Sequence, residues 1–238
     1  MKKLFVNILC GCVPDKQKRK ALRAGLNNNA LIHKYTEFVK SFSDQKKPKI
    51  TYSYGFRCAN FVVTLDDKYV FKFPFTNDGY DIATREKRIT DALRPISPIK
   101  IPEMEIIDFN GVAVRKYEFI HGIGFHHLDK KTQNAYADKI AKQLAQFLYV
   151  VGMADPVKIR DLKPNKSIKP SIMYGWNQND LWDNFLLDPK TFDIVGAIDW
   201  EDAAFCDFYV CFTGGTGNTT IRTALLREYT KLICDDNK

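Results

Sequence analysis

The sequence contains no apolar run long enough to cross a membrane, for which about 20 consecutive apolar residues would be needed. It has six cysteines but no Cys-x-x-Cys pair, and no histidine stands at zinc spacing from a cysteine. Acidic residues at ligand spacing are also missing beside His121, His126 and His127. We therefore expect a reduced chain with small buried thiols and without a zinc or histidine metal centre.

An excess of basic over acidic residues is missing outside the first part of the chain. Residues 1–50 contain 12 of the 36 Lys and Arg side chains and only 3 acidic ones, whereas the rest of the chain is nearly balanced. A nucleic-acid-binding domain is expected to carry its basic charge on a folded face. The distribution is more typical of a basic arm, so no nucleic-acid partner is predicted.

A β-rich region follows this arm. Residues 50–54, 61–65 and 69–73 have the composition of strands, with a turn at Asp66-Asp67. Lys72 stands between Phe71 and Phe73, which would face the opposite side of the strand. A lysine buried in this way needs an anionic partner. The alternative is a lysine that protects an edge strand from pairing.

Helical and further strand patterns complete the chain. Apolar residues recur at helical spacing over 30–42, 82–93, 129–152 and 221–234. The helix over 129–152 is the clearest, with one apolar stripe from Tyr136 to Val151. Two more strands, 104–107 and 111–119, are predicted around a turn at Asn110-Gly111. With 238 residues, the chain can form two small lobes.

The most informative stretch runs from residue 177 to residue 207. Two apolar runs, 185–187 and 194–198, flank a turn at 188–190 and predict a hairpin. Such a hairpin would bring Asp180, Asp183 and Asn184 close to Asp199. Clustered carboxylates repel one another unless a cation lies between them, and hard oxygen ligands suit Mg²⁺. The alternative is that these side chains are solvated turn residues.

This stretch resembles the catalytic segment of the aminoglycoside phosphotransferase-like and choline-kinase-like small-molecule kinases, which share the protein-kinase fold. Asn179-Asp180-Leu181 is similar to their catalytic loop, and Ile198-Asp199-Trp200-Glu201 is similar to their metal-binding segment. The resemblance covers about residues 50–215. It implies a two-lobed α+β fold with a small β-rich N-lobe (49–120) and a reduced helical C-lobe (121–238), preceded by the arm and helix of 1–48.

The resemblance also implies a reaction, the transfer of the ATP γ-phosphate to a hydroxyl group. Asp180 would be the base that orients this hydroxyl, and Asp199 would bind Mg²⁺ with the help of Asn184. Lys72 would hold the phosphates of ATP and be fixed by Glu86. The remaining nucleotide contacts would come from the turn after the first strand and from the hinge between the lobes, at Gly55, Asn60, Glu118 and Ile120.

Three features depart from the family pattern, and the first two leave an alternative open. Gln178 replaces the usual histidine, and Asn184 follows Asp180 by four residues where the family has five. Cys206-Asp207-Phe208 also stands where Gly-Asp-Pro is usual. An inactive, kinase-shaped binding protein is therefore the competing interpretation.

The acceptor is predicted from charge alone. Five basic residues lie between Lys158 and Lys169, just before the catalytic stretch, where they would attract an anionic acceptor. This favours a sugar or a cell-envelope glycan intermediate over a polycationic aminoglycoside. Choline or ethanolamine would need an aromatic or acidic cage, which the sequence does not exclude. A solvated connection is the alternative for these basic residues.

The first residues imitate an export signal, since two lysines precede the short apolar run 4–9 and Leu9–Cys12 resembles a lipoprotein cleavage box. We expect the chain to be cytoplasmic, because a fold that uses ATP belongs where ATP is. The run and the basic residues after it leave two interpretations open. One is peripheral contact with the inner face of the membrane, and the other is a solvated helix packed on the kinase body.

Overall fold

The computed structural model describes residues 19, 29–54, 60–75, 79–152, 159, 162, 174–207 and 218–236. Contacts between residues divide the chain into two compact units. The N-terminal unit extends to Ala83 and includes Glu105–Phe119, and the C-terminal unit comprises Thr84–Met104 and the chain from Ile120 onward. Thr84–Met104 thus belongs to the C-terminal unit, although the sequence placed it in a lobe spanning 49–120.

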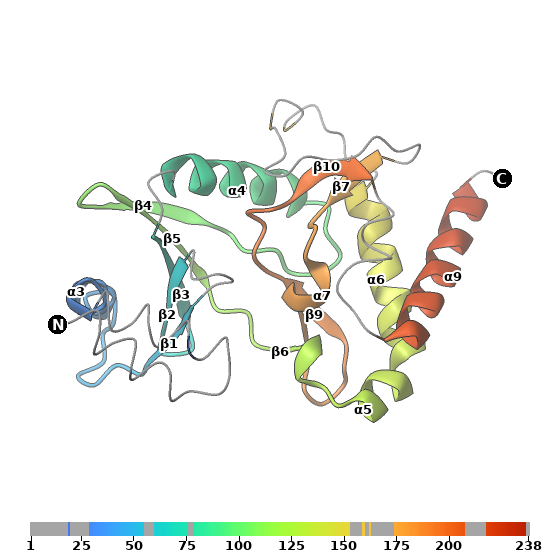
Figure 1. Ribbon diagram of the computed structural model, residues 1–238, viewed down its shortest axis with the longest axis horizontal. Coiled ribbons are helices and arrows are strands. Elements are labelled where there is room, and N and C mark those ends of the chain that lie inside the picture. Colours follow the sequence, from blue (N-terminus) through green and yellow to red (C-terminus); the bar gives the residue numbers. More distant parts are fainter. Residues whose placement is uncertain are drawn as a thin grey trace. The chain divides into compact units, whose positions relative to one another are not determined.

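The N-terminal unit contains one antiparallel sheet of five strands in the order β1-β2-β3-β5-β4 (Figure 1). Its predicted turn at Asn110-Gly111 is confirmed, because both residues have positive φ, as a two-residue hairpin loop requires. The strands are β1 (Ile50–Tyr54), β2 (Asn60–Leu65), β3 (Tyr69–Pro74), β4 (Glu105–Phe109) and β5 (Val112–Glu118).

Helix α3 (Asn29–Lys40) covers one face of this sheet and confirms the helix predicted for 30–42. Tyr35 and Val39 are buried against Phe71 and Phe73, and the Tyr35 ring stacks on the Phe73 ring with centroids 4.1 Å apart. The two phenylalanines therefore face the helix, as the alternation around Lys72 predicts, and Lys72 lies on the other face.

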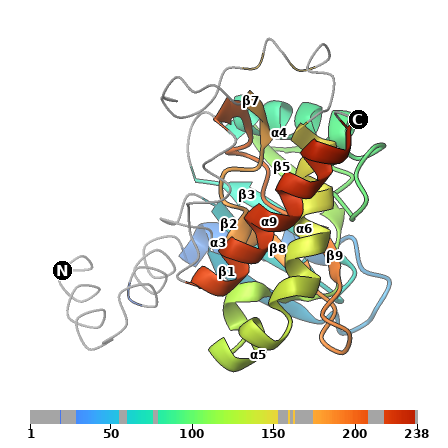
Figure 2. The same ribbon diagram turned by 90° about the vertical axis from the view of Figure 1, so that its right-hand side faces the viewer.

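The C-terminal unit is mainly helical. Helix α6 (Ala137–Gly152) packs along α9 (Thr219–Asp236), and both views show the two helices side by side (Figures 1 and 2). Much of α4 (Gly79–Leu93) also belongs to this unit. The short elements are β6 (Ile123–Gly124), the 3₁₀ turn η2 (Phe125–His127), α5 (Lys130–Ala135), β7 (Tyr174–Asn177), α7 (Leu181–Asn184), β8 (Phe185–Leu187), β9 (Ile194–Ala197) and β10 (Ala204–Asp207).

The prediction of one helix over 129–152 is wrong at Tyr136. This residue ends α5 with φ −106° and ψ 10°, and α6 begins after it. Its ring packs on Phe192, with centroids 4.2 Å apart, and not in the core with the rest of the apolar stripe. Tyr136 stands at helical spacing in the sequence, so the apolar pattern continues across the position where one helix ends and the next begins.

The predicted hairpin of residues 185–198 is confirmed as β8 and β9, which pair antiparallel. Sequence analysis missed the two-stranded sheet formed by β7 and β10. This sheet joins the segments on either side of the hairpin, because Asn177 pairs with Ala204. Within the described residues, no helix combines the length and apolar character that a membrane span needs.

Helix α6 holds the hairpin through two side chains. The Gln143 amide donates to Asp193 Oδ1 over 2.6 Å and accepts from the Ile194 N–H over 2.6 Å. Lys139 Nζ lies 2.8 Å from Asp193 Oδ1. Hydrogen bonds from Lys139, Thr191 and Gln143 lower the pKa of Asp193 to about 2. The carboxylate is therefore charged throughout the neutral range and fixes the start of β9.

We predict that Gln143→Ala lowers the free energy of unfolding by about 1–3 kcal/mol, because it leaves the buried Ile194 N–H without this acceptor. Gln146 lies on the exposed side of the same helix, so Gln146→Ala should change stability by no more than about 0.5 kcal/mol. Urea unfolding of both variants measures this difference. Equal effects would show that Gln143 does not anchor the hairpin.

Candidate functional site

The turn after β7 is organised by its own side chains. Asn177 is buried and its Oδ1 accepts the Asn179 N–H over 2.8 Å. Asn179 has φ 70°, a left-handed conformation that asparagine tolerates better than most residues other than glycine. Gln178 is also buried, and its Oε1 accepts the Asp180 N–H over 2.8 Å. These bonds fix the backbone of the predicted catalytic residue.

The other end of the Gln178 amide reaches the segment after β9. Its Nε2 donates to the carbonyl oxygens of Ile198, over 3.0 Å, and Asp199, over 2.6 Å. One side-chain amide thus joins the backbone of Asp180 to the backbone of Asp199. The predicted hairpin implied that Asp180 and Asp199 lie close together. Gln178, which joins their backbones in the structure, is the residue that departs from the family pattern.

Asp199 has φ 60°, a left-handed conformation that costs on the order of 1–3 kcal/mol for a residue with a side chain unless its surroundings enforce it. Trp200, which follows, supplies part of that constraint. Its fully buried indole donates to the Ala197 carbonyl over 2.9 Å. Its backbone N–H donates over 2.9 Å to Oε1 of Glu86, a buried residue of α4.

Side chains also hold the segment beyond Trp200. Arg85 of α4 donates through Nη1 to the Glu201 carbonyl over 2.7 Å and through Nη2 to the Ala203 carbonyl. Asn179 Nδ2 donates to the Asp202 carbonyl over 2.7 Å. The backbone from Ile198 to Ala203, hereafter the 198–203 loop, is therefore held at each residue by side chains of α4 and of the 177–180 turn.

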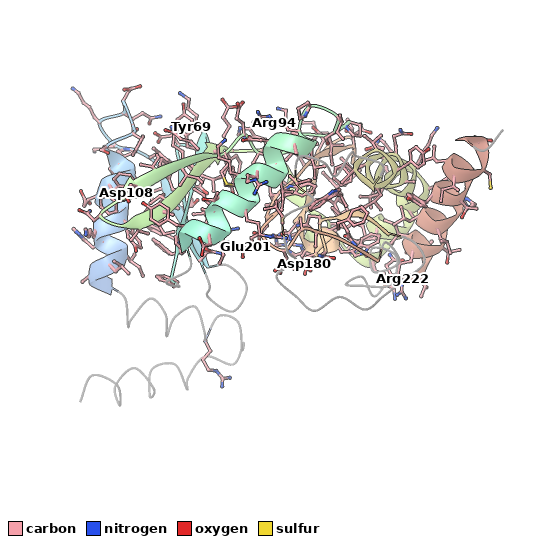
Figure 3. All side chains as sticks on the ribbon, turned by 90° about the horizontal axis from the view of Figure 1, so that it is seen from above. Tyr69, Arg94, Asp108, Asp180, Glu201 and Arg222 are labelled. Carbon is pink, nitrogen blue, oxygen red and sulfur yellow. The ribbon has the colours of Figure 1, made fainter. Side chains whose placement is uncertain are left out.

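Asp180 is exposed and directly precedes the helical turn α7. Aspartate at this position usually caps a helix, but the Asp180 carboxylate makes no such bond. Asn184, at the end of α7, donates through Nδ2 to the Asp180 carbonyl over 3.0 Å, and its own carbonyl accepts the Ile198 N–H over 2.9 Å. The four-residue spacing is thus one turn of helix, which links Asp180 through Asn184 to Ile198, the residue after β9. Figure 3 labels Asp180 and Glu201 in this region.

The donors predicted for the metal site are few and are of the hard, oxygen type. No group of three or more His, Cys, Asp or Glu side chains suited to a metal occurs in the part of the chain that the structure describes. Mg²⁺ commonly uses one or two carboxylates and completes its shell with phosphate oxygens and water. The Asp199 carboxylate and the Asn184 amide oxygen are hard donors of this type. Asn184 Nδ2 is turned toward Asp180, so Oδ1 points in a different direction.

Lys72 lies in the N-terminal unit, on the central strand β3, and is 3% exposed. The alternative of an edge lysine is therefore wrong, because β2 and β5 flank β3. Strand register places Lys72 opposite Arg115, which is also buried and which sequence analysis did not single out. Arg115 donates to Oδ1 of Asn60 over 2.5 Å. This face of the sheet thus carries two neighbouring buried cations, which need hydrogen-bonding or negatively charged partners.

The remaining predicted residues are placed as follows. Glu118 ends β5, and Ile120, 9% exposed, begins the second stretch of the C-terminal unit. Glu86 is in the C-terminal unit and Lys72 in the N-terminal unit, so their pairing stays a prediction. Gly55, the basic residues from Lys158 to Lys169 and the N-terminal arm apart from residue 19 lie outside the described residues.

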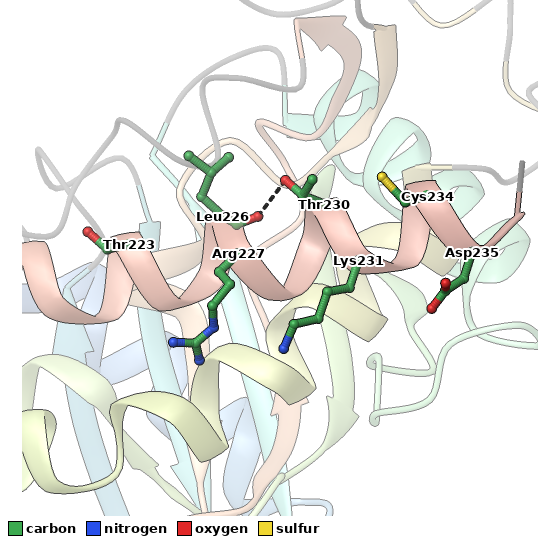
Figure 4. Close-up of a pocket in the computed structure, with 7 residues that line it drawn as sticks. All are labelled: Thr223, Leu226, Arg227, Thr230, Lys231, Cys234 and Asp235. Atoms are coloured by element: carbon green, nitrogen blue, oxygen red, sulfur yellow. Dashed lines mark hydrogen bonds between the residues drawn. The ribbon is translucent and has the colours of Figure 1, made fainter.

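A surface hollow of about 580 Å³ runs along the outer face of α9, where Leu226 and Cys234 are exposed (Figure 4). All of its lining residues belong to α9, and one hydrogen bond, from Thr230 to the Leu226 carbonyl, lies within it. None of the predicted site residues lines it, so we do not connect it with catalysis.

Comparison with known proteins supplies an independent view of this arrangement. No protein-family model and no curated protein matches the sequence. Solved structures match well. The GDP and kanamycin complex of APH(2")-IIia aligns over 86% of this chain and 85% of that one, with a TM-score of 0.65 and 19% identity. The chain has the fold of these phosphotransferases.

Two further structures agree. The streptomycin-ATP-APH(2")-IIa ternary complex aligns over 83% of both chains, with a TM-score of 0.57 and 14% identity. Macrolide 2'-phosphotransferase MphH from Brachybacterium faecium gives the same TM-score and identity, and 82% of that chain is covered. The predicted α+β fold, with a β-rich N-terminal part and a helical C-terminal part, is confirmed, and so is the resemblance to aminoglycoside phosphotransferases.

Within this phosphotransferase fold, we predict that Gln178→Glu is destabilising although the side chain keeps its shape. A carboxylate cannot donate to the Ile198 and Asp199 carbonyls and places negative charge against them, so the loss should be about 2 kcal/mol or more. The matched control is Gln146→Glu on the exposed side of α6, which should change stability by about 0.5 kcal/mol at most. Urea unfolding that gives equal values for both variants would contradict the bridging role of Gln178.

Proposed function

We propose that the chain is a phosphotransferase that moves the γ-phosphate of a nucleoside triphosphate, ATP by expectation, to a hydroxyl group of a small molecule. The observation that carries this proposal is the Gln178 amide, which bonds the backbone of Asp180 at one end and the backbone of Asp199 at the other. Phosphoryl transfer needs an acidic residue at the attacking hydroxyl beside residues that hold the metal and the phosphates. The two linked turns supply these two kinds of residue.

Asp180 is the proposed base and orienting group for the acceptor hydroxyl. Its carboxylate is exposed and is not used to cap α7, while bonds from Gln178 and Asn184 fix its backbone. Such fixation matters because much of the rate of phosphoryl transfer comes from correct positioning of the reacting groups.

Asp199 and Asn184 are the residues proposed to hold Mg²⁺. When bound, Mg²⁺ would neutralise the negative charge that develops on the phosphates during transfer. The protein's contribution is to fix both ligands before any nucleotide arrives. The left-handed backbone of Asp199 is held by Gln178, and the Asn184 carbonyl bonds the Ile198 N–H.

The nucleotide is proposed to use the residues that the resemblance implies. Lys72 would bind the phosphates, Gly55 and Asn60 would belong to the turn over them, and backbone groups of Glu118 and Ile120 would meet the base. Support comes from the burial of Lys72 on the central strand beside a second cation, Arg115. Glu86, the expected partner of Lys72, has in addition the structural task of holding Trp200.

The structural neighbours favour the aminoglycoside alternative over the sugar or glycan acceptor. The matched structures are named as aminoglycoside and macrolide phosphotransferases, and two contain kanamycin or streptomycin. The case for an anionic glycan drew on the five basic residues from Lys158 to Lys169, all of which lie outside the described residues. We therefore propose an antibiotic-like polyhydroxylated acceptor. The bonds made by Gln178 favour an active enzyme over an inactive binding protein.

We predict that Asp180→Asn lowers kcat by about a hundredfold or more while nucleotide affinity stays nearly unchanged, because the variant loses the proton acceptor but keeps the fold. Asp183→Asn is the matched control, since Asp183 is exposed on the same helical turn, and it should retain activity within about threefold. Steady-state kinetics with the best acceptor measure both. Comparable activity in Asp180→Asn and the wild type would refute the assignment of the base.

Asp199→Asn should abolish the Mg²⁺-dependent part of nucleotide binding, because it removes the carboxylate from the proposed metal site. Calorimetric titration with ATP, in the presence of Mg²⁺ and of EDTA, measures this part separately. If the variant binds Mg-ATP as tightly as the wild type, the metal is held elsewhere.

Substrate class is tested by ATP turnover with kanamycin, gentamicin, a macrolide, simple sugars, lipid-linked glycans and choline. The proposal expects turnover with an aminoglycoside or a macrolide to exceed turnover with sugars or choline by at least about tenfold in kcat/KM. A preference for sugars or glycans would restore the earlier prediction. No turnover with any acceptor, together with tight nucleotide binding, would support the inactive binding protein.

A further inference from the structure

We propose that Arg85 is a positioning residue that keeps the 198–203 loop in the conformation that presents Asp199. This inference rests on the proposed function, since it concerns the geometry of the proposed metal site. It starts from a contact that local sequence cannot indicate, because Arg85 and its two acceptors are 116 and 118 residues apart.

The arrangement uses the shape of the guanidinium group. Nη1 donates to the Glu201 carbonyl over 2.7 Å, and Nη2 donates to the Ala203 carbonyl. The planar fork of arginine can meet two acceptors at once with fixed geometry, whereas a lysine ammonium is a single point charge on a flexible stem. The two carbonyls flank Asp202, whose own carbonyl is bonded by Asn179. Three consecutive peptide groups are thereby immobilised.

The burial of Arg85 makes these hydrogen bonds energetically important. Arg85 is 9% exposed, and burial lowers the pKa of its guanidinium, while the charges of Asp202 and Glu86 act in the opposite direction. A buried cation is retained only where hydrogen bonds and nearby negative charge offset the loss of its hydration. The 198–203 loop supplies two acceptors to this buried cation, and Arg85 in turn fixes two carbonyl groups of that loop.

Glu86, the next residue of α4, also contacts the 198–203 loop, but as a hydrogen-bond acceptor. Its Oε1 accepts the Trp200 N–H, and Arg85 donates to carbonyls on the far side of that residue. Adjacent residues of one helix thus bind a donor and two acceptors of a single loop. A rotation or a shift of α4 would break all three bonds together, so the conformation of Asp199 is coupled to the position of this helix.

The first test needs neither metal nor substrate. In the nucleotide-free protein, Arg85→Lys should raise amide hydrogen exchange by at least about fivefold in peptides covering 198–203, and leave α6 and β8 unchanged. The matched control is Arg88→Lys, the same substitution at an exposed position of α4. Unchanged exchange at 198–203 would overturn the proposal. An equal rise of exchange in α6 would also overturn it, because this would show a general loss of stability.

The second test concerns Mg²⁺. Arg85→Lys should raise the Mg²⁺ concentration needed for half-maximal nucleotide binding by about tenfold, as the loss of a residue that supports a metal ligand commonly does. Arg88→Lys should not change it, and the acceptor KM should be the same in both variants. If the wild type shows no Mg²⁺-dependent nucleotide binding, the proposed function fails. If the wild type shows it and Arg85→Lys requires no more Mg²⁺, only the role of Arg85 fails.

Discussion

The site depends on the side-chain amide of Gln178, which is hydrogen-bonded at both its oxygen and its nitrogen. A neutral amide has a donor and an acceptor side, and here the acceptor meets the Asp180 N–H while the donor meets the carbonyls of Ile198 and Asp199. A carboxylate could not make both kinds of bond. Inside a protein such bonds are strong, and an unmade one is costly. Gln178, the residue that departs from the family pattern, therefore has a structural role of its own in joining the two turns.

Around this amide, the site is built by side chains that bind backbone. Helix α4 contributes Arg85 and Glu86, and the 177–180 turn contributes Asn179. Because these contacts go to backbone groups, side chains of α4 and of the 177–180 turn determine the conformation of the 198–203 loop. Asp199 can therefore keep a left-handed conformation that it would not adopt alone. In the N-terminal unit, Lys72 is placed by strand alternation, with phenylalanines on its other side facing α3.

Much of this could be predicted where the signal is local. Alternation around Lys72, the Asn110-Gly111 turn and the hairpin of β8 and β9 follow from patterns within a few residues, and the structure confirms them. Strands β7 and β10 were missed because each has four residues of mixed composition and is defined only by its partner. The break at Tyr136 was missed because an aromatic residue continued the helical spacing. The bonds of Arg85 span more than a hundred residues, so no local pattern could indicate them.

We propose that the turns joined by Gln178 form the metal and phosphoryl-transfer site of a phosphotransferase fold. The most direct measurement is a crystal structure of the protein with Mg²⁺ and a non-hydrolysable ATP analogue. We expect Mg²⁺ bound to the Asp199 carboxylate and to phosphate oxygens, with the Asp180 carboxylate facing the γ-phosphate and the Gln178 bonds intact. A nucleotide bound without metal at Asp199, or bound away from the 177–180 turn, would contradict it.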